Sequence, residues 1–262
     1  MTETTETTAG EPAVYNRVPK VTVDFWLIKL MAVTVGETAA DFLASNLGLG
    51  LSATSWIMTG VLVAALVLQF AQKRYVPWAY WLAVVMISVV GTLISDNLVD
   101  NLGVSLETTT TVFAIALAAT FIGWYAVEKT LSIHTIFTTR REAFYWLAIL
   151  FTFALGTSAG DFLSEGIGLG YLESGLLYGA LIAVIAAAFF TSRMNGILAF
   201  WLAYILTRPM GASFGDLLSQ PVPDGGIGLG TVITSALFLG SIAAIVVYMT
   251  VTSRGLERVR TR

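Results

Sequence analysis

The sequence has no cysteine, a single histidine (His134) and very few charged residues. Without cysteine the chain has no disulfide framework, no thiolate metal site and no thiol nucleophile, and one histidine excludes a zinc site built from several. Asp, Glu, Lys and Arg make up only 12% of the 262 residues, whereas a soluble protein carries about 25%. So few charges would leave large apolar patches in contact with water, and an ordinary soluble enzyme is therefore not expected.

Apolar residues are correspondingly abundant. They make up 56% of the chain, with a mean hydropathy of +0.79, as is typical of an integral membrane protein. The net charge of −3 and the pI of about 5.2 favour no nucleic-acid partner. Residues 1–20 are rich in Thr and Glu and lack the apolar segment of a signal peptide. They are predicted to form a flexible, solvated tail.

Three residues recur four times with the same spacing. A tryptophan that follows another aromatic residue is followed after ten positions by a glycine, and five positions later by an aspartate. Successive copies are 55, 65 and 55 residues apart, which indicates four homologous units arranged as two halves of two. The copies are Trp26, Trp81, Trp146 and Trp201; Gly36, Gly91, Gly156 and Gly211; and Asp41, Asp96, Asp161 and Asp216.

Each unit holds two apolar stretches of about 20 residues, the length that crosses a hydrocarbon core of about 30 Å. The predicted spans are 22–44, 51–71, 77–98, 108–127, 143–164, 171–190, 196–218 and 230–252. The fold class is therefore predicted to be an all-α integral membrane protein with eight transmembrane helices in four two-helix repeats. The repeats are placed at about 21–75, 76–130, 141–194 and 195–252, within one membrane domain (21–252) followed by a basic tail (253–262).

Lys and Arg are distributed unequally between the loops. The loops after even-numbered spans carry them, as do both termini, whereas the Gly-rich loops after odd-numbered spans carry none. The positive-inside rule then predicts that both termini are cytoplasmic and that the Gly-rich loops face outward.

Four Trp…Gly-x-x-x-x-Asp units in an eight-span chain resemble a bacterial family of membrane-anchored proteins built from a tandem short membrane repeat of unknown function. The closest match is the segment from Trp26 to Leu47, which contains Gly36-Glu-Thr-Ala-Ala-Asp41, and the resemblance covers nearly the whole chain after Val18. It implies an eight-helix protein of the bacterial inner membrane and implies no activity.

Further polar residues share a helix face with the repeated aspartates, because positions four apart lie on one side of a helix. Three of the four odd spans carry a second carboxylate there, in the pairs Glu37/Asp41, Asp96/Asp100 and Asp161/Glu165. Thr92 and Thr157 hold the matching place before Asp96 and Asp161, and Arg208 lies two turns before Asp216. Arg208 is expected to act either as an internal counter-ion of the site or as the ion-pair partner of Asp216.

Carboxylates at membrane depth call for an explanation. One charged side chain costs about 2.5–3.5 kcal/mol at the centre of a membrane helix, and neutral polar residues could join helices without that cost. Carboxylates and hydroxyls are ligands for hard cations. All seven carboxylates are predicted to bind or relay a cation, supported by Thr92, Thr157 and Arg208. The candidate metal ligands are Glu37, Asp41, Asp96 and Asp161.

Weaker signals accompany this pattern. The repeated glycines are expected to permit close helix packing, and Pro209 predicts a break in the seventh span. Four hydroxyl residues at the start of the even spans fit helix N-caps, and Lys29 is expected to extend toward the cytoplasmic boundary. The hydroxyl residues are Thr54, Thr109, Ser174 and Thr234.

The leading hypothesis is a small-cation transporter or exporter, proton-coupled or acting on a divalent metal, and not an enzyme. Two alternatives stay open: a membrane scaffold or accessory protein without transport activity and, with less support, an intramembrane hydrolase that uses paired carboxylates as acid and base. The expected partners are the lipid bilayer and the cation. No cofactor is expected beyond a bound cation.

Overall fold

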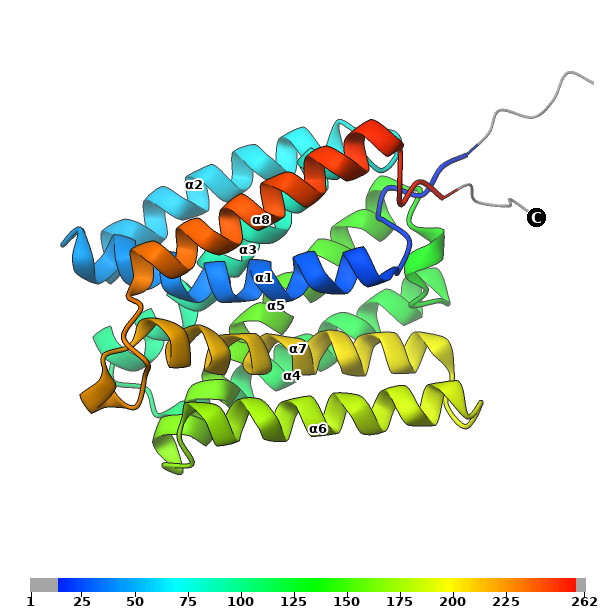
Figure 1. The fold of residues 1–262 in the computed structure, drawn as a ribbon. Helices are drawn as coiled ribbons and strands as arrows, with labels where there is room; N and C mark the ends of the chain where they lie inside the picture. Colours follow the sequence, from blue (N-terminus) through cyan, green and yellow to red (C-terminus); the bar gives the residue numbers. More distant parts are fainter. Residues whose placement is uncertain (1–13, 258–262) are drawn as a thin grey trace, which may run out of the picture.

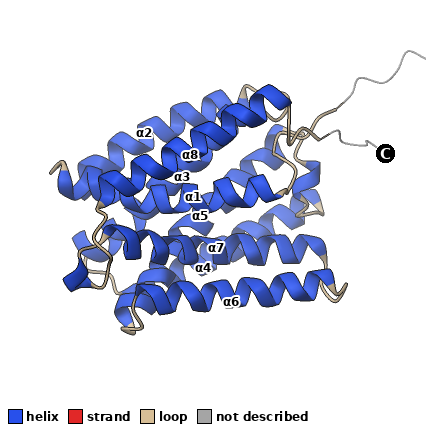
Figure 2. Cartoon of the chain, viewed as in Figure 1, coloured by secondary structure: helices blue, strands red, loops and turns tan. Residues whose placement is uncertain are grey.

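The computed structural model describes residues 14–257, which form eight α-helices (Figures 1 and 2). The all-helical prediction is confirmed, and the eight predicted spans agree with the observed helices to within a few residues. The helices are α1 (Val23–Asp41), α2 (Leu51–Phe70), α3 (Pro77–Asp96), α4 (Leu106–Glu128), α5 (Thr139–Asp161), α6 (Tyr171–Phe190), α7 (Gly196–Ser219) and α8 (Thr231–Thr252).

The helices form an inner ring and an outer shell. The odd-numbered helices make the ring, in which α1 contacts α3, α3 contacts α5, α5 contacts α7 and α7 returns to α1. Each even-numbered helix packs on the inner helix that follows it, so α2 covers α3, α4 covers α5, α6 covers α7 and α8 covers α1. In α3, α5 and α7, 56–61% of the most apolar stretch is buried, against 11–22% in the even-numbered helices. The apolar faces of the shell therefore point outward.

The repeated glycines lie where neighbouring inner helices approach most closely. A Cβ atom at any of them would lie 2.7 Å or less from a side-chain atom of the next inner helix, so only glycine fits there. The contacts run one way around the ring, and the last one closes it on α1. They join Gly36 to Ser88, Gly91 to Phe153, Gly156 to Arg208 and Gly211 to Val33.

Seven helices in the described part of the chain are long and apolar enough to cross a membrane, and α1 is not among them. In its 19 residues α1 carries four charged side chains, Asp24, Lys29, Glu37 and Asp41. It lies between α3, α7 and α8, where neighbouring helices rather than the surroundings can satisfy its polar groups.

Residues 14–20 pack against the loop before α5 and against residues 255–257. The buried Asn16 side chain donates to the Ile133 carbonyl at 2.8 Å and accepts from the Ile136 amide at 3.0 Å. The Lys20 amide donates to the Gly255 carbonyl at 3.0 Å. The prediction of a flexible, solvated tail is therefore wrong for this stretch, while residues 1–13 and 258–262 lie outside the described part.

Two smaller predictions are also wrong. Helix α7 continues through Pro209 without a break. The four hydroxyl residues assigned as N-caps lie four residues inside their helices and are buried. Three of those helices begin instead after a glycine whose positive φ is easily adopted only by that residue. The residues at the cap positions are Gly50, Ser105, Gly170 and Gly230.

Candidate functional site

The inner helices stack equivalent residues in layers along the axis of the ring, because the same spacing places each inner helix in the same register. Contacts between the helices support this register: Thr92 lies against both Glu37 and Thr157, and Tyr80 meets Tyr145. We name six layers by their residues. They are the rim layer (Ser45, Asp100, Glu165, Gln220), the aspartate layer (Asp41, Asp96, Asp161, Asp216), the floor layer (Glu37, Thr92, Thr157, Ala212), the arginine layer (Val33, Ser88, Phe153, Arg208), the lysine layer (Lys29, Val84, Ile149, Tyr204) and the aromatic layer (Phe25, Tyr80, Tyr145, Phe200).

Exposure falls steadily along this stack. Most of the rim layer is exposed, three of the four aspartates are half-buried, and every residue from the floor layer to the aromatic layer is buried. The axis is thus accessible from the end that carries the Gly-rich loops, here called the acidic end. It is closed by packed rings at the opposite end, here called the basic end, to which the Lys- and Arg-bearing loops belong.

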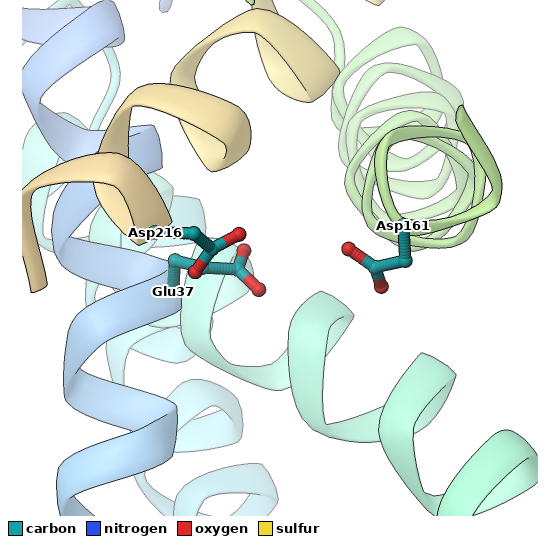
Figure 3. A group of neighbouring side chains, drawn as sticks. All are labelled: Glu37, Asp161 and Asp216. Atoms are coloured by element: carbon teal, nitrogen blue, oxygen red, sulfur yellow. The ribbon is translucent and has the colours of Figure 1, made fainter. Parts of the chain in front are cut away.

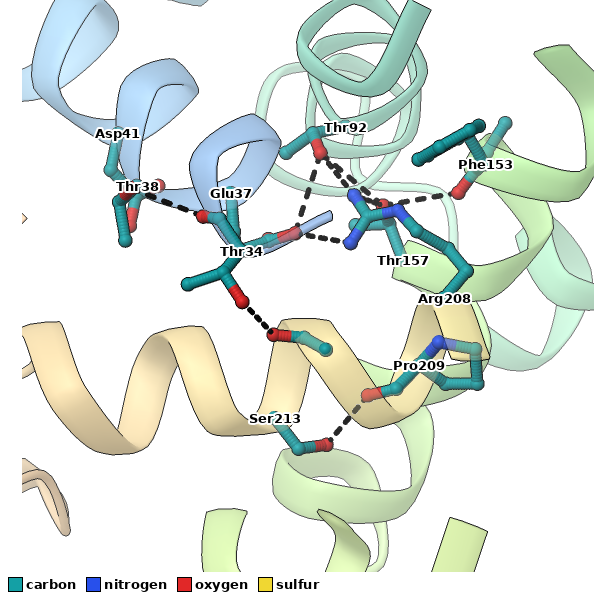
Figure 4. Close-up of polar contacts among 12 residues, drawn as sticks. Thr34, Glu37, Thr38, Asp41, Thr92, Phe153, Thr157, Arg208, Pro209 and Ser213 are labelled. Carbon is teal, nitrogen blue, oxygen red and sulfur yellow. Dashed lines mark hydrogen bonds and ion pairs between the residues drawn. The ribbon is translucent and has the colours of Figure 1, made fainter. Parts of the chain in front are cut away.

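Arg208 closes the accessible part of the ring axis on the side of the basic end. Its backbone lies in the arginine layer, but its guanidinium reaches into the floor layer, where it forms an ion pair with Glu37 at 2.8 Å. It also donates to the Thr157 hydroxyl at 2.6 Å and to the Thr92 hydroxyl (Figure 4). Helix α7 contributes only Ala212 to this layer, which leaves room for the guanidinium. The alternative pairing with Asp216 is wrong, because the side chain extends across the ring instead of along its own helix.

Three carboxylates meet next to the Arg208 guanidinium, on the side of the acidic end. Glu37, Asp161 and Asp216 each place one oxygen so that the three atoms lie within 4.8 Å of one another. They come from α1, α5 and α7 and point toward a common space (Figure 3). Two oxygens on opposite sides of a Ca²⁺ ion lie about 5 Å apart, so the group has the dimensions of a site for a hard cation. We call these three residues the carboxylate cluster.

The cluster differs in part from the predicted metal ligands. It contains Glu37 and Asp161 as expected, but Asp216 takes the place assigned to Asp41 and Asp96. Asp41 instead accepts a hydrogen bond from the Gln220 side chain at 3.3 Å. Thr92 and Thr157, predicted as supporting residues, both accept hydrogen bonds from the guanidinium, and the Thr92 hydroxyl also donates to the Glu37 carboxylate of the cluster at 3.3 Å.

The two rim carboxylates lie apart from the cluster. Asp100 and Glu165 are exposed, and Glu165 accepts a hydrogen bond from the Tyr171 hydroxyl at 3.1 Å. The reason is a change of helix type, because α1, α3 and α5 each pass into a π-helical turn directly after the repeated aspartate. Such a turn takes about one residue more than an α-helical turn, so a position four residues on leaves the shared face. The turns are Phe42–Asn46, Asn97–Asn101 and Phe162–Gly166.

Lys29 is the functional candidate that sequence reasoning missed. It does not extend toward the basic end but is fully buried in the ring, where its ammonium donates to the Tyr204 carbonyl at 2.9 Å and to the Thr207 hydroxyl. It also lies 4.1 Å from the centre of the Tyr204 ring. Its place in the series of four-residue steps that runs back from Asp41 through Glu37 and Val33 is the signal that could have identified it.

Comparison with known protein families identifies the repeat. The family model described as a Repeat of Unknown Function (DUF347) matches residues 25–75, 79–130, 144–195 and 199–255. Each match contains one inner helix and the outer helix that follows it. No curated protein and no solved structure matches the chain. Because the four matches together cover most of the sequence, the chain belongs to the family of proteins built from this repeat.

Proposed function

We propose that this protein spans the bacterial inner membrane with all eight helices and transports a small, hard divalent cation through the carboxylate cluster. The seven apolar helices and the outward-facing apolar surfaces of the shell support membrane insertion. α1 completes the set as the polar member of the inner ring, shielded from lipid by its neighbours.

The same considerations give an orientation. The Lys- and Arg-bearing loops and both termini belong to the basic end, which is therefore cytoplasmic by the positive-inside rule. The acidic end then opens outward. Four two-helix units, related as two pseudo-symmetric halves, would surround one central site, as in other transporters built from internal repeats.

The carboxylate cluster is the observation that carries the proposal. Its three residues come from three different inner helices and converge on the axis. The four repeated aspartates form no ion pair with any described residue between 14 and 257. Unpaired carboxylates are costly within a membrane protein and mark ion pathways. Three oxygens at this separation suit a divalent metal with oxygen ligands.

One observation favours the scaffold alternative. Arg208, from α7, contacts α1, α3 and α5 at once, and a bridge of that kind would also stabilise a bundle that moves nothing. The two alternatives predict different effects of removing a carboxylate. Cation transport would be lost in a transporter, whereas a scaffold has no transport activity that the substitution could remove.

The test is cation uptake into liposomes that contain the purified protein, with Mn²⁺, Ca²⁺ and Na⁺ supplied in turn. We expect uptake of a divalent cation by the wild type and a loss of about tenfold or more in Asp161→Asn and Asp216→Asn, because each substitution removes a charged ligand. Asp224→Asn is the matched control, since Asp224 is exposed in the loop between α7 and α8 and its substitution should leave uptake unchanged.

Thermal stability of the same variants separates the alternatives. Removal of an unpaired buried charge should leave the bundle as stable as before or more stable. Unchanged uptake in both cluster variants, or no divalent uptake by the wild type, would overturn the transport proposal in favour of the scaffold.

A further inference from the structure

We infer that the floor layer is a guanidinium-binding site which Arg208 fills as a tethered cation, and that the transported ion takes Glu37 by displacing it. The inference rests on the proposed function, since it concerns how the same cluster is regulated. Arg208 would hold the site closed when no cation is bound and release it when one arrives.

The floor layer has the components that recognise a guanidinium. A carboxylate oxygen of Glu37 and the hydroxyl oxygens of Thr157 and Thr92 accept its hydrogen bonds. The Phe153 ring lies 5.5 Å from its central carbon, within the range of a cation–π contact. The layer therefore binds a planar cation from three inner helices, and the cation it binds belongs to the fourth.

The guanidinium has a second place to go. Its backbone lies one layer closer to the basic end, in the arginine layer, to which Ser88 of α3 also belongs. The Ser88 hydroxyl and the Nε atom of Arg208 are both buried and lack a hydrogen-bond partner. A shift of the Arg208 side chain toward the basic end would release Glu37 and move the guanidinium into the layer that holds the unsatisfied Ser88 hydroxyl.

The charges around Arg208 favour its present position when the cluster is empty. Toward the acidic end it faces Glu37 and the cluster, whereas toward the basic end the next charged group is Lys29, whose contacts are a carbonyl, a hydroxyl and two aromatic rings. On the other helices the adjoining positions are Val33, Ser88 and Phe153, which carry no charge. A divalent cation in the cluster would reverse this balance by repelling the guanidinium.

The two cations compete because they share Glu37. One of its oxygens accepts from Arg208 at 2.8 Å, while the residue also belongs to the cluster. Two ligands that oppose each other at one site change each other's affinity by a common factor, which is typically ~5–150-fold.

The experiment measures the Kd of purified protein in detergent for Mn²⁺, with free Mn²⁺ counted by electron paramagnetic resonance. Arg208→Gln should bind Mn²⁺ about tenfold more tightly or better, because the competing charge is gone. Arg208→Lys, which keeps the charge but loses the planar fork, should fall between it and the wild type. If Arg208→Gln does not fold, the Kd of Arg208→Lys for Mn²⁺ still tests the inference. Arg254→Gln removes an exposed charge at the basic end and should change nothing.

A chemical complement tests the guanidinium site itself. In Arg208→Ala, added guanidinium ion should weaken Mn²⁺ binding back toward the wild-type value, whereas tetramethylammonium, which has no N–H donor, should not. In the wild type neither ion should act, because Arg208 already fills the site.

The outcomes are distinguishable. If neither the wild type nor any variant binds Mn²⁺, the proposed function fails. If the wild type binds Mn²⁺ but the Arg208 variants bind it with equal or lower affinity, the transport proposal stands and the tethered competitor is rejected. Equal effects of guanidinium on the wild type and Arg208→Ala would also reject it.

Discussion

The two ends of the inner ring treat charge in opposite ways. At the basic end, buried or partly buried charges are paired: Glu142 binds Arg17 at 2.7 Å and also accepts from Gln69 at 2.8 Å, and Glu128 pairs with two arginines. At the acidic end the Arg208 guanidinium pairs with Glu37, and the four repeated aspartates form no ion pair within residues 14–257. Charge pairing therefore stabilises the basic end, whereas the unpaired carboxylates of the acidic end are the groups through which the proposed cation binding would act.

Packing differs in the same sense. The aromatic layer near the basic end is closed by ring contacts, with Phe25 lying 6.0 Å from Phe200 and Tyr80 within 2.5 Å of the Tyr145 hydroxyl. The aspartate and rim layers have no such ring contacts and are partly accessible. The proposed transport would require a site of this kind, accessible from one end and closed at the other.

The largest predicted difference comes from truncation of the seal. Phe25→Ala should destabilise the protein by about 3 kcal/mol, because Phe25 is buried against four aromatic rings and its removal leaves a cavity. Thermal unfolding in detergent is the measurement, with Phe190→Ala as the control, since Phe190 is 81% exposed. Equal losses in the two variants would show that the aromatic layer is not a packed seal.

A smaller difference should separate the buried charges of the two ends. Glu142→Gln at the basic end should cost about 2 kcal/mol, because Arg17 loses its partner and hydrogen bonds to a charged group are lost. Asp216→Asn at the acidic end should cost nothing or stabilise. The two unfolding temperatures, measured at pH 7, should move in opposite directions or at least differ in size. A clear loss in Asp216→Asn would mean that its charge is structural.

The smallest effect concerns pH at the basic end. His134 lies in the loop before α5, where its hydrogen bond to Glu257 at 3.1 Å raises the pKa of the imidazole above its usual 6.5. A raised folded-state pKa means that the pair stabilises fully below pH 6.5, while Glu257 stays ionised, and that this stabilisation is lost as the pH rises through the folded pKa. The histidine is half exposed, so less than ~1 kcal/mol is expected.

The measurement compares unfolding temperatures of the wild type and His134→Gln at pH 6 and pH 8.5. At pH 6 the wild type should unfold at a slightly higher temperature than His134→Gln, and at pH 8.5 this difference between the two proteins should vanish. A difference that grows with pH would contradict the assignment.

Much of the architecture follows from the sequence because helical periodicity and repeat spacing are local properties. Two apolar stretches in each unit predict eight helices, and the spacing of the repeated Trp, Gly and Asp residues places Asp41, Asp96, Asp161 and Asp216 at one register. It also predicts that the repeated glycines lie at helix contacts, where the structure has them.

The site itself could not be predicted to the same degree. Helical spacing tells which residues share a face, but it does not tell how far a long side chain extends, and Arg208 crosses a whole layer to reach Glu37. Spacing also assumes one helix type, and the π-helical turns after Asp41, Asp96 and Asp161 violate that assumption. Lys29 departs from its predicted position for a third reason: its partners come from α7, about 175 residues later in the chain.

The packing of each outer helix on the inner helix of the next unit sets the order in which the protein can be completed during synthesis. Helices α3, α5 and α7 each follow directly on the outer helix that covers them, whereas α1 is covered by α8, the last of the eight described helices in chain order. The partners of Glu37 and Lys29 on α7 are also made late. Helix α1 can therefore complete its contacts, and the ring can close, only after α7 and α8 have both been made.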